Sequence, residues 1–187
     1  MLVPRRNART VDPDGRTTRD DRMNRAMASR TAFGKQVIAA QWAVAEFGAL
    51  CRLWELGVPV PYPVQILGTE ILQEFIGTPD GYAAPRLAQV SDGLDDLWEQ
   101  LVAAMVALAR EGLAHGDLSP DNLLVHDGRL VIIDLPQIVD VIAHPAGPSF
   151  LDRDARNVAT WFAAKGVTAA GPESLAALLS AEAGLVR

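Results

Sequence analysis

The feature that most constrains the fold is a hairpin pattern, LLVHDGRLVIID, over residues 123–134. Apolar residues stand on both sides of Asp127-Gly128, a dipeptide typical of the two-residue turn between antiparallel strands, because such a turn needs a positive φ at both positions. We therefore expect strands over 123–126 and 129–133. A turn of two residues fixes how the strands pair, so it also fixes which residues meet at the open end of the hairpin.

The open end of this hairpin brings two oxygen-bearing side chains together. In the expected register Asn122 faces Ile133, and Asp134 lies one step further along the chain. Carboxylate and carboxamide oxygens, few in number and supplemented by oxygens of a bound substrate, suit Mg²⁺ or Mn²⁺. The pattern therefore predicts a divalent-cation site formed by Asn122 and Asp134.

The loop before the hairpin, HGDLSPDN at residues 115–122, adds a third functional group. Asp117 has no obvious ligand role, and we expect it to orient or deprotonate a hydroxyl group or a water molecule. His115 is expected to hold the loop backbone rather than to transfer a proton. An Asp, an Asn five residues later and a second Asp after a hairpin form the arrangement used in phosphoryl transfer.

The rest of the chain reads as helices with few strands. Besides the hairpin, the expected elements are a helix over 35–57 that stops at Gly57, an extended connector over 58–64, two short strands within 65–77 about a Gly68-Thr69 turn, a helix capped by Ser91 or Asp92 and ending near Gly112, and helices over about 150–164 and 173–184. The pattern predicts an α+β protein whose second half is mainly helical.

Composition limits the size and the setting of the protein. The 187 residues allow one substantial core or two small lobes. The formal net charge is −6, but residues 1–30 carry eight Arg against four Asp. We interpret them as a solvated, poorly packed head, with contact to RNA or the ribosome as a minor alternative. No apolar run is as long as a membrane span and no signal peptide is evident, so we expect a cytoplasmic protein without membrane contact.

Two families share the HGDLSPDN pattern, the aminoglycoside/choline phosphotransferases and the RIO-type protein kinases. The segments VIIDLPQIVD with the following HP (131–145) and LDRDARNVATWF (151–162) resemble the RIO family. Upstream, EFGALCRLWELGVPVPYPV, ILQEFIG and APRL also resemble that family in order and spacing. The similarity covers roughly residues 20–165, so the RIO family is favoured, and a small-molecule phosphotransferase remains the alternative.

The resemblance implies a protein-kinase-like, two-lobed fold with a compact, mainly helical C-lobe, and a serine/threonine kinase or ATPase that uses ATP with Mg²⁺ or Mn²⁺. Carried over by position, it implies Asp117 as the catalytic Asp, Asn122 and Asp134 as metal ligands, Glu74 and Ile76 in the segment that pairs with adenine, Glu46 as the acid that pairs with the ATP-anchoring Lys, and Ser119 as a residue that positions phosphate.

The resemblance leaves the N-lobe incomplete. We expect a head over 1–30, a partial N-lobe over 31–77 and a C-lobe over 78–187, because the family's glycine-rich loop and its ATP-anchoring Lys are not found ahead of the helix at 35–57. Either the chain is weakly active, or it is a non-catalytic pseudokinase that binds other proteins. The sequence does not say whether the phosphate acceptor is a protein or a small hydroxyl compound.

Overall fold

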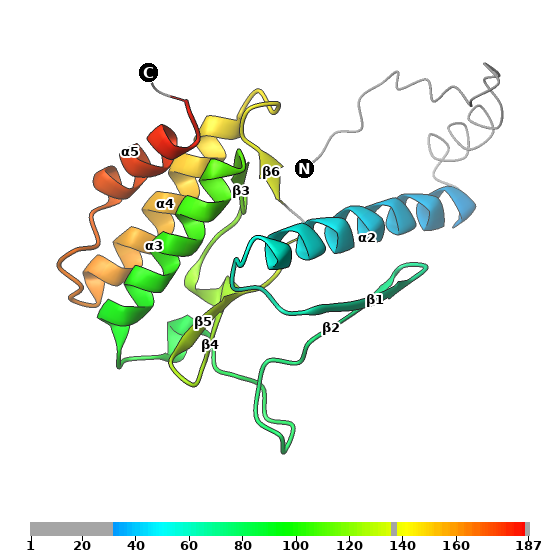
Figure 1. Cartoon of the computed structure of the whole chain (residues 1–187), viewed down its shortest axis with the longest axis horizontal. Coiled ribbons are helices and arrows are strands. Elements are labelled where there is room, and N and C mark those ends of the chain that lie inside the picture. The colour runs from blue at the N-terminus through cyan, green and yellow to red at the C-terminus, as the bar shows by residue number, and fades with distance from the viewer. Residues whose placement is uncertain (1–31, 136–137, 186–187) are drawn as a thin grey trace.

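The computed structural model describes residues 32–135 and 138–185, and the Arg-rich head lies outside them. The elements follow the order α2 (Ala32–Glu55), β1 (Pro63–Leu67), β2 (Glu70–Gln73), η1 (Leu87–Gln89), α3 (Leu94–Arg110), β3 (Leu113–Ala114), η2 (Pro120–Asn122), β4 (Leu123–His126), β5 (Arg129–Ile132), β6 (Val139–Asp140), α4 (Gly147–Ala164) and α5 (Pro172–Glu182). The α+β class is confirmed, and α3, α4 and α5 form a bundle beside the part made of α2, β1 and β2 (Figure 1).

Helix α2 ends where the sequence predicts. Gly57 adopts a φ of +75°, which a residue with a side chain rarely takes, and the Val58 N–H donates to the Leu53 carbonyl at 3.0 Å. The apolar side chains of the helix are only partly buried: Leu53 is in the core, whereas the Trp42 side chain is 56% exposed. The helix therefore packs through its C-terminal half, and its outer half extends over the β1–β2 hairpin (Figure 1).

One hydrophobic core joins both parts of the molecule. Leu50 and Leu53 of α2, together with Val58 and Val60 of the connector, belong to the same buried cluster as the inner faces of α3, α4 and α5. The Ile132 N–H also donates to the Pro59 carbonyl at 2.7 Å, which ties the connector to β5. The last turns of α2 are therefore fixed to the helical part, while the division of the chain at residues 30 and 77 stays a prediction.

The β4–β5 hairpin has the register that its turn predicts. Cα partners run from His126↔Arg129 at the turn to Leu123↔Ile132 at the open end. Asp127 and Gly128 both have positive φ, at 50° and 73°, as a primed two-residue turn requires. The strand after the turn ends one residue earlier than expected, which lies within the usual uncertainty of strand ends.

A side chain of α3 clamps this hairpin. Gln100 donates from Nε2 to the Gly128 carbonyl and accepts the Leu130 N–H on Oε1, both at 2.9 Å. The amide thus satisfies one backbone donor and one backbone acceptor at the turn. The hairpin is consequently attached to the helical bundle as well as to the connector.

The cap predicted for α3 is wrong. Gly93 occupies the N-cap position in a left-handed conformation, with a φ of 67°, and no side chain caps the helix. A glycine fits this position because the entering backbone turns through a region that disfavours Ser91 or Asp92. The buried face of α3 agrees with the sequence pattern and contains Leu94, Leu97, Trp98, Leu101, Met105 and Leu108.

One strand pair was not predicted. Strands β3 and β6 pair antiparallel over two residues each, with Leu113 opposite Asp140 and Ala114 opposite Val139.

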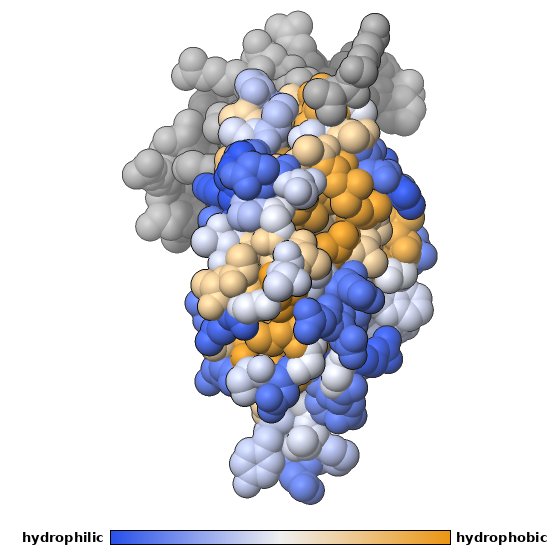
Figure 2. All heavy atoms as spheres, turned by 90° about the vertical axis from the view of Figure 1, so that its left-hand side faces the viewer, coloured by the Kyte–Doolittle hydropathy of each residue, from blue (hydrophilic) through white to orange (hydrophobic). Residues whose placement is uncertain are grey.

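The outward face of the C-terminal helices mixes hydrophilic and hydrophobic side chains (Figure 2). Within residues 32–135 and 138–185, no helix is long and apolar enough to cross a membrane.

Candidate functional site

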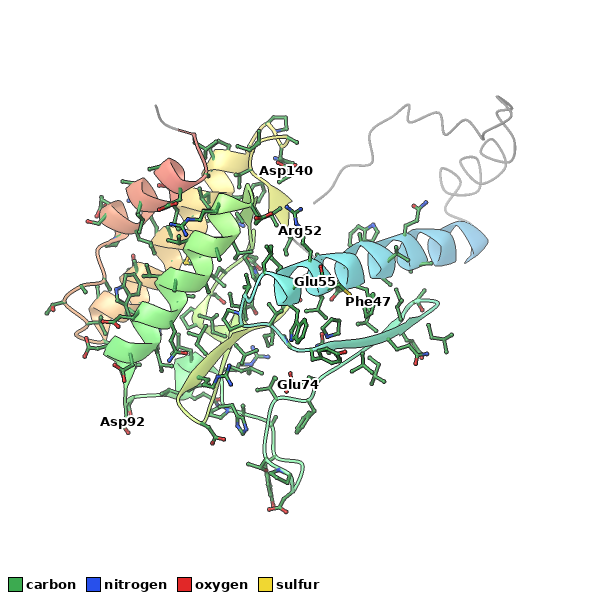
Figure 3. The ribbon with its side chains drawn as sticks, in the orientation of Figure 1. Phe47, Arg52, Glu55, Glu74, Asp92 and Asp140 are labelled. Carbon is green, nitrogen blue, oxygen red and sulfur yellow. The ribbon has the colours of Figure 1, made fainter. Side chains whose placement is uncertain are left out.

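A cleft of about 390 Å³ opens where α2, the end of β2 and the open end of the β4–β5 hairpin meet. It is lined by Glu46, Leu50, Pro61, Gln73, Glu74, Phe75, Ile76, Ala83, Leu124, Ile133, Asp134 and Leu135. Figure 3 shows Glu74 below α2, where the chain leaves β2. The cleft thus brings together four of the predicted site residues, Glu46, Glu74, Ile76 and Asp134.

The chain segment that leaves β2 presents backbone groups to this cleft. The Glu74 N–H donates to the Tyr62 carbonyl at 2.9 Å, and its carboxylate accepts the Tyr62 N–H at 3.1 Å. The Ile76 carbonyl accepts the Ala84 N–H at 2.9 Å. Among the described residues, no hydrogen bond engages the Glu74 carbonyl or the Ile76 N–H. One acceptor and one donor are therefore available two residues apart.

Glu46 reaches the cleft from α2. Burial raises the pKa of the Glu46 carboxyl above its ordinary value, and the negative charge of Asp134 raises that pKa further. No ion pair in the described part of the chain engages Glu46. The Glu46 carboxyl thus lies near the Asp134 carboxylate, and no cation among the described residues pairs with Glu46.

The open end of the hairpin holds Asn122 and Asp134 in adjacent positions. Asn122 donates from Nδ2 to the Asp117 carbonyl at 2.9 Å, so its Oδ1 remains an acceptor. The Ile133 N–H donates to the Asn122 carbonyl at 3.0 Å and places Asp134 next along the strand. Asp134 is exposed and has a φ of 64°, a left-handed conformation that only a few per cent of residues other than glycine adopt.

These oxygens fit a cation that takes part of its coordination from elsewhere. In the described ranges, no group of three or more His, Cys, Asp or Glu side chains could hold a metal ion by itself. One carboxylate and one carboxamide oxygen are the donors that a hard cation such as Mg²⁺ uses when a substrate and water supply the remaining ligands. The donor set therefore suits Mg²⁺ bound together with phosphate oxygens.

Two buried side chains hold the loop that carries Asp117. His115 is 1% exposed, and its Nε2 lies 3.0 Å from the Ile133 carbonyl, an acceptor, so this nitrogen donates. The other ring nitrogen of His115 has no partner in the described structure. Asp154 of α4, also 1% exposed, accepts the N–H groups of Gly116 at 2.7 Å and Leu118 at 2.9 Å. The loop backbone is thus fixed from both sides.

A role for Asp154 in the candidate site was not predicted from the sequence. Burial raises the pKa of its carboxyl, although the two backbone N–H groups oppose that shift. A signal was present, because Asp154 falls on the apolar stripe of α4 formed by Leu151, Ala155 and Val158. An acidic residue at a position that faces the core must be satisfied by hydrogen bonds, and here the partners belong to the candidate site.

Asp117 itself points to solvent rather than into the cleft lining. Its side chain is 61% exposed, and the nearest described cation is Arg153, whose Nη2 lies 4.0 Å from Asp117 Oδ1. Ser119 precedes the short helix η2, and its carbonyl accepts the Asn122 N–H at 3.0 Å. The structure thus ties Asp117 to Asn122 through the loop backbone, while the roles of these residues remain predictions.

The comparisons with known proteins agree on one family. A family model described as RIO domain matches residues 8–175. The chain is 42% identical over 137 residues to the RIO-type serine/threonine-protein kinase Rio1 of Haloferax volcanii, covering 73% of this chain and 46% of that protein. Serine/threonine-protein kinase RIO1 of Caenorhabditis elegans is 40% identical over 134 residues, which cover 70% of this chain and 26% of that protein. For serine/threonine-protein kinase RIO1 of Saccharomyces cerevisiae the identity is 32% over 146 residues, which cover 75% of this chain and 30% of that protein.

The fold also resembles a solved structure. The crystal structure of the Rio2 kinase from Chaetomium thermophilum matches with a TM-score of 0.56 and 24% identity, over 98% of this chain and 57% of that chain. This likeness shows a kinase-like fold. The chain spans less than half the length of the three curated relatives named above.

Proposed function

Because the chain belongs to the RIO family of atypical kinases, we propose that it binds ATP with Mg²⁺ in the cleft and transfers the γ-phosphate to a serine or threonine hydroxyl group of a protein. The observation that carries the proposal is the meeting of the free backbone groups near β2 with Asp134 in one cleft. The name of the solved Rio2 relative describes a complex with ADP, Mg²⁺ and phosphoaspartate, which supports the choice of nucleotide and metal.

The adenine ring would lie against the segment after β2. Adenine presents an amino donor beside a ring-nitrogen acceptor, and the Glu74 carbonyl and the Ile76 N–H complement that pair. Phe75 and Leu135 add apolar contact from the cleft lining. Recognition would therefore depend on the backbone, so substitution of the Glu74 side chain should affect nucleotide binding less than substitution of Asp134.

The phosphates would lie near the open end of the hairpin. Asn122 and Asp134 are the residues that would hold Mg²⁺, and the ion would supply positive charge to the phosphate oxygens. Asp117, on the adjoining loop, would orient the acceptor hydroxyl and take its proton. The hydrogen bonds that the loop N–H groups donate to Asp154, and the hydrogen bond from His115 to the Ile133 carbonyl, keep this loop in place.

The charge of the cleft limits the expected rate. Glu46, Glu74 and Asp134 line it, and no Lys or Arg does so in the described part of the chain. Phosphoryl transfer depends on positioning and charge neutralisation, so a site without a basic anchor loses powers of ten in rate, at ~1.4 kcal/mol each. The acidic lining therefore favours a second candidate, a pseudokinase that binds nucleotide and protein partners without turnover.

A small hydroxyl compound is the alternative acceptor. Contact of the Arg-rich head with RNA or the ribosome is a prediction about residues outside the described structure. Both are open to test with the intact chain.

The experiment compares the wild type with D117N, D134N and D121N. Calorimetry measures binding of MgADP, and a γ-phosphate label measures hydrolysis and transfer. We expect D134N to lose Mg²⁺-dependent binding, and D117N to retain binding while turnover falls about 10²–10⁴-fold. D121N changes an exposed Asp of the same loop and should match the wild type. Binding without turnover in the wild type and in D121N would support the pseudokinase, binding unchanged in D134N would contradict the role proposed for Asp134, and absence of nucleotide binding in the wild type would refute both candidates.

A further inference from the structure

Arg153 is a basic side chain placed beside the proposed catalytic Asp, and the proposed function gives it no role. It lies on α4, and its Nη2 donates to the Gly116 carbonyl in the loop that precedes Asp117. The same nitrogen is 4.0 Å from Asp117 Oδ1, too far for a direct hydrogen bond. The guanidinium also stacks over the Phe150 ring, with its carbon 5.0 Å from the ring centroid. Arg153 is thus held in one position by a carbonyl and an aromatic face.

Most of the hydrogen-bonding capacity of Arg153 remains available. A guanidinium carries five N–H donors, and the described contacts use one of them on Gly116. The side chain is 48% exposed, so the remaining donors reach solvent. A fixed guanidinium with free donors is suited to bind a carboxylate or a phosphate group.

The neighbouring acids engage this charge electrostatically but do not take hydrogen bonds from it: Asp117 pairs with Arg153 at 4.0 Å, and the charge of Arg153 opposes the rise in the pKa of Asp154. Asp154 uses its two carboxylate oxygens on the N–H groups of Gly116 and Leu118. Asp152 is engaged by Arg156, at 2.9 and 3.0 Å from Nε to its two oxygens. Among the described residues, neither Asp117 nor Asp154 accepts a hydrogen bond from the Arg153 guanidinium, so donors of that group remain for a further acceptor.

The position of Arg153 points to the acceptor rather than to the nucleotide. The cleft lining includes Asp134 but not Asn122, Asp117 or Arg153, so it is the place of Arg153 beside Asp117 that associates it with the acceptor. An acceptor hydroxyl reaches Asp117 from solvent, and the Arg153 side chain beside Asp117 is itself 48% exposed. Groups that flank the hydroxyl of a bound peptide would therefore come within reach of the guanidinium.

We propose that Arg153 is a specificity-determining residue that binds an acidic side chain of the phosphate acceptor, next to the hydroxyl group that Asp117 receives. The inference rests on the proposed function and adds the class of acceptor, an acidic peptide segment. The ion pair selects the acceptor by charge and simultaneously fixes the distance between the acidic side chain and the reacting hydroxyl.

The test uses two fluorescein-labelled peptides, one with a serine flanked on both sides by aspartates and one with asparagines in their place. Binding is measured by anisotropy with the intact protein and MgADP, and transfer is measured with labelled MgATP. We expect the wild type to prefer the acidic peptide by about tenfold, since hydrogen bonds between charged groups are worth more than neutral ones. Addition of salt should reduce that preference.

The variants separate the charge of Arg153 from its structural contact. R153Q removes the charge while keeping a polar side chain, so the preference should fall to about one while affinity for MgADP is retained. R153K keeps the charge without the planar fork and should retain part of the preference. R156Q, on the exposed side of the same helix, should leave the preference unchanged.

Each failure identifies a different error. Equal binding of the two peptides by the wild type, no detectable binding of the acidic peptide, or a preference that survives in R153Q would overturn the proposal. A loss of MgADP affinity in R153Q, with the peptide preference intact, would assign Arg153 to the nucleotide instead. Wild-type protein that binds no MgADP at all contradicts the proposed function itself, and the peptide preference is still read from anisotropy.

Discussion

The carboxylate of Asp154 should be the most sensitive single group that supports the candidate site. Replacement by alanine leaves the N–H groups of Gly116 and Leu118 buried without an acceptor. Each unsatisfied donor costs about 1–3 kcal/mol. The wild-type carboxylate is itself destabilised by burial, as the raised pKa of Asp154 shows, and its removal recovers part of that cost. We therefore expect D154A to lower the free energy of unfolding by about 2–4 kcal/mol.

The D154N variant tests the same two hydrogen bonds with a smaller change. Asn keeps the shape and one acceptor oxygen, but its amide nitrogen would face a backbone N–H, so D154N should lose about half as much stability as D154A. Urea unfolding followed by tryptophan fluorescence measures both losses, and calorimetry with MgADP reports whether the Asp117 loop still supports the site. T160A, an exposed change on the same helix, is the control. A stability of D154A within about 0.5 kcal/mol of the wild type would refute the view that Asp154 anchors the loop.

Three further changes test separate features. The pKa of Glu46 is raised in the folded protein, so the fold favours the neutral form of this carboxyl. E46Q should therefore raise the free energy of unfolding at pH 7. In urea titrations this gain should disappear as the pH falls through the folded pKa toward 4.5. G147A should destabilise by about 1–3 kcal/mol in urea, because its Cβ would clash with the Val141 backbone, whereas G48A, with open space around it, should stabilise by about 0.5–1 kcal/mol. Q100A should cost about 1–2 kcal/mol and speed hydrogen exchange at the hairpin turn, and exchange that matches the wild type would contradict the clamp.

Local sequence signals predicted the parts of the site that depend on neighbours along the chain. Asp127-Gly128 fixed the turn, the turn fixed the register, and the register placed Asn122 and Asp134 together. Each step involves residues within twelve positions of one another, and each has one sterically favoured solution. The neighbouring placement of Asn122 and Asp134 at the open end follows from the turn, while their role as metal ligands stays a prediction.

The parts that the sequence did not predict depend on contacts distant in the chain. Asp154 meets the loop near Gly116 from a helix that begins about thirty residues later, and no spacing rule joins them. The two-residue strands β3 and β6 are too short to show an alternation of apolar and polar residues. At the start of α3, Gly93 replaced the expected polar cap because the geometry of the preceding loop decides the cap, and that geometry is set by tertiary packing.

The two ends of the β4–β5 hairpin differ in how far their length can change. Its turn reaches solvent at one end, while Asn122 and Asp134 stand at the other. Adding one residue to each strand beside the turn would lengthen the arm and leave the pairing at the far end untouched, with loss of the Gln100 hydrogen bonds at the turn. Adding a residue to one strand alone would shift one side by a position and turn every side chain of the shifted strand to the opposite face. Relatives should therefore tolerate growth of this arm in symmetric pairs, and engineered insertions that carry tags or labels should follow the same rule.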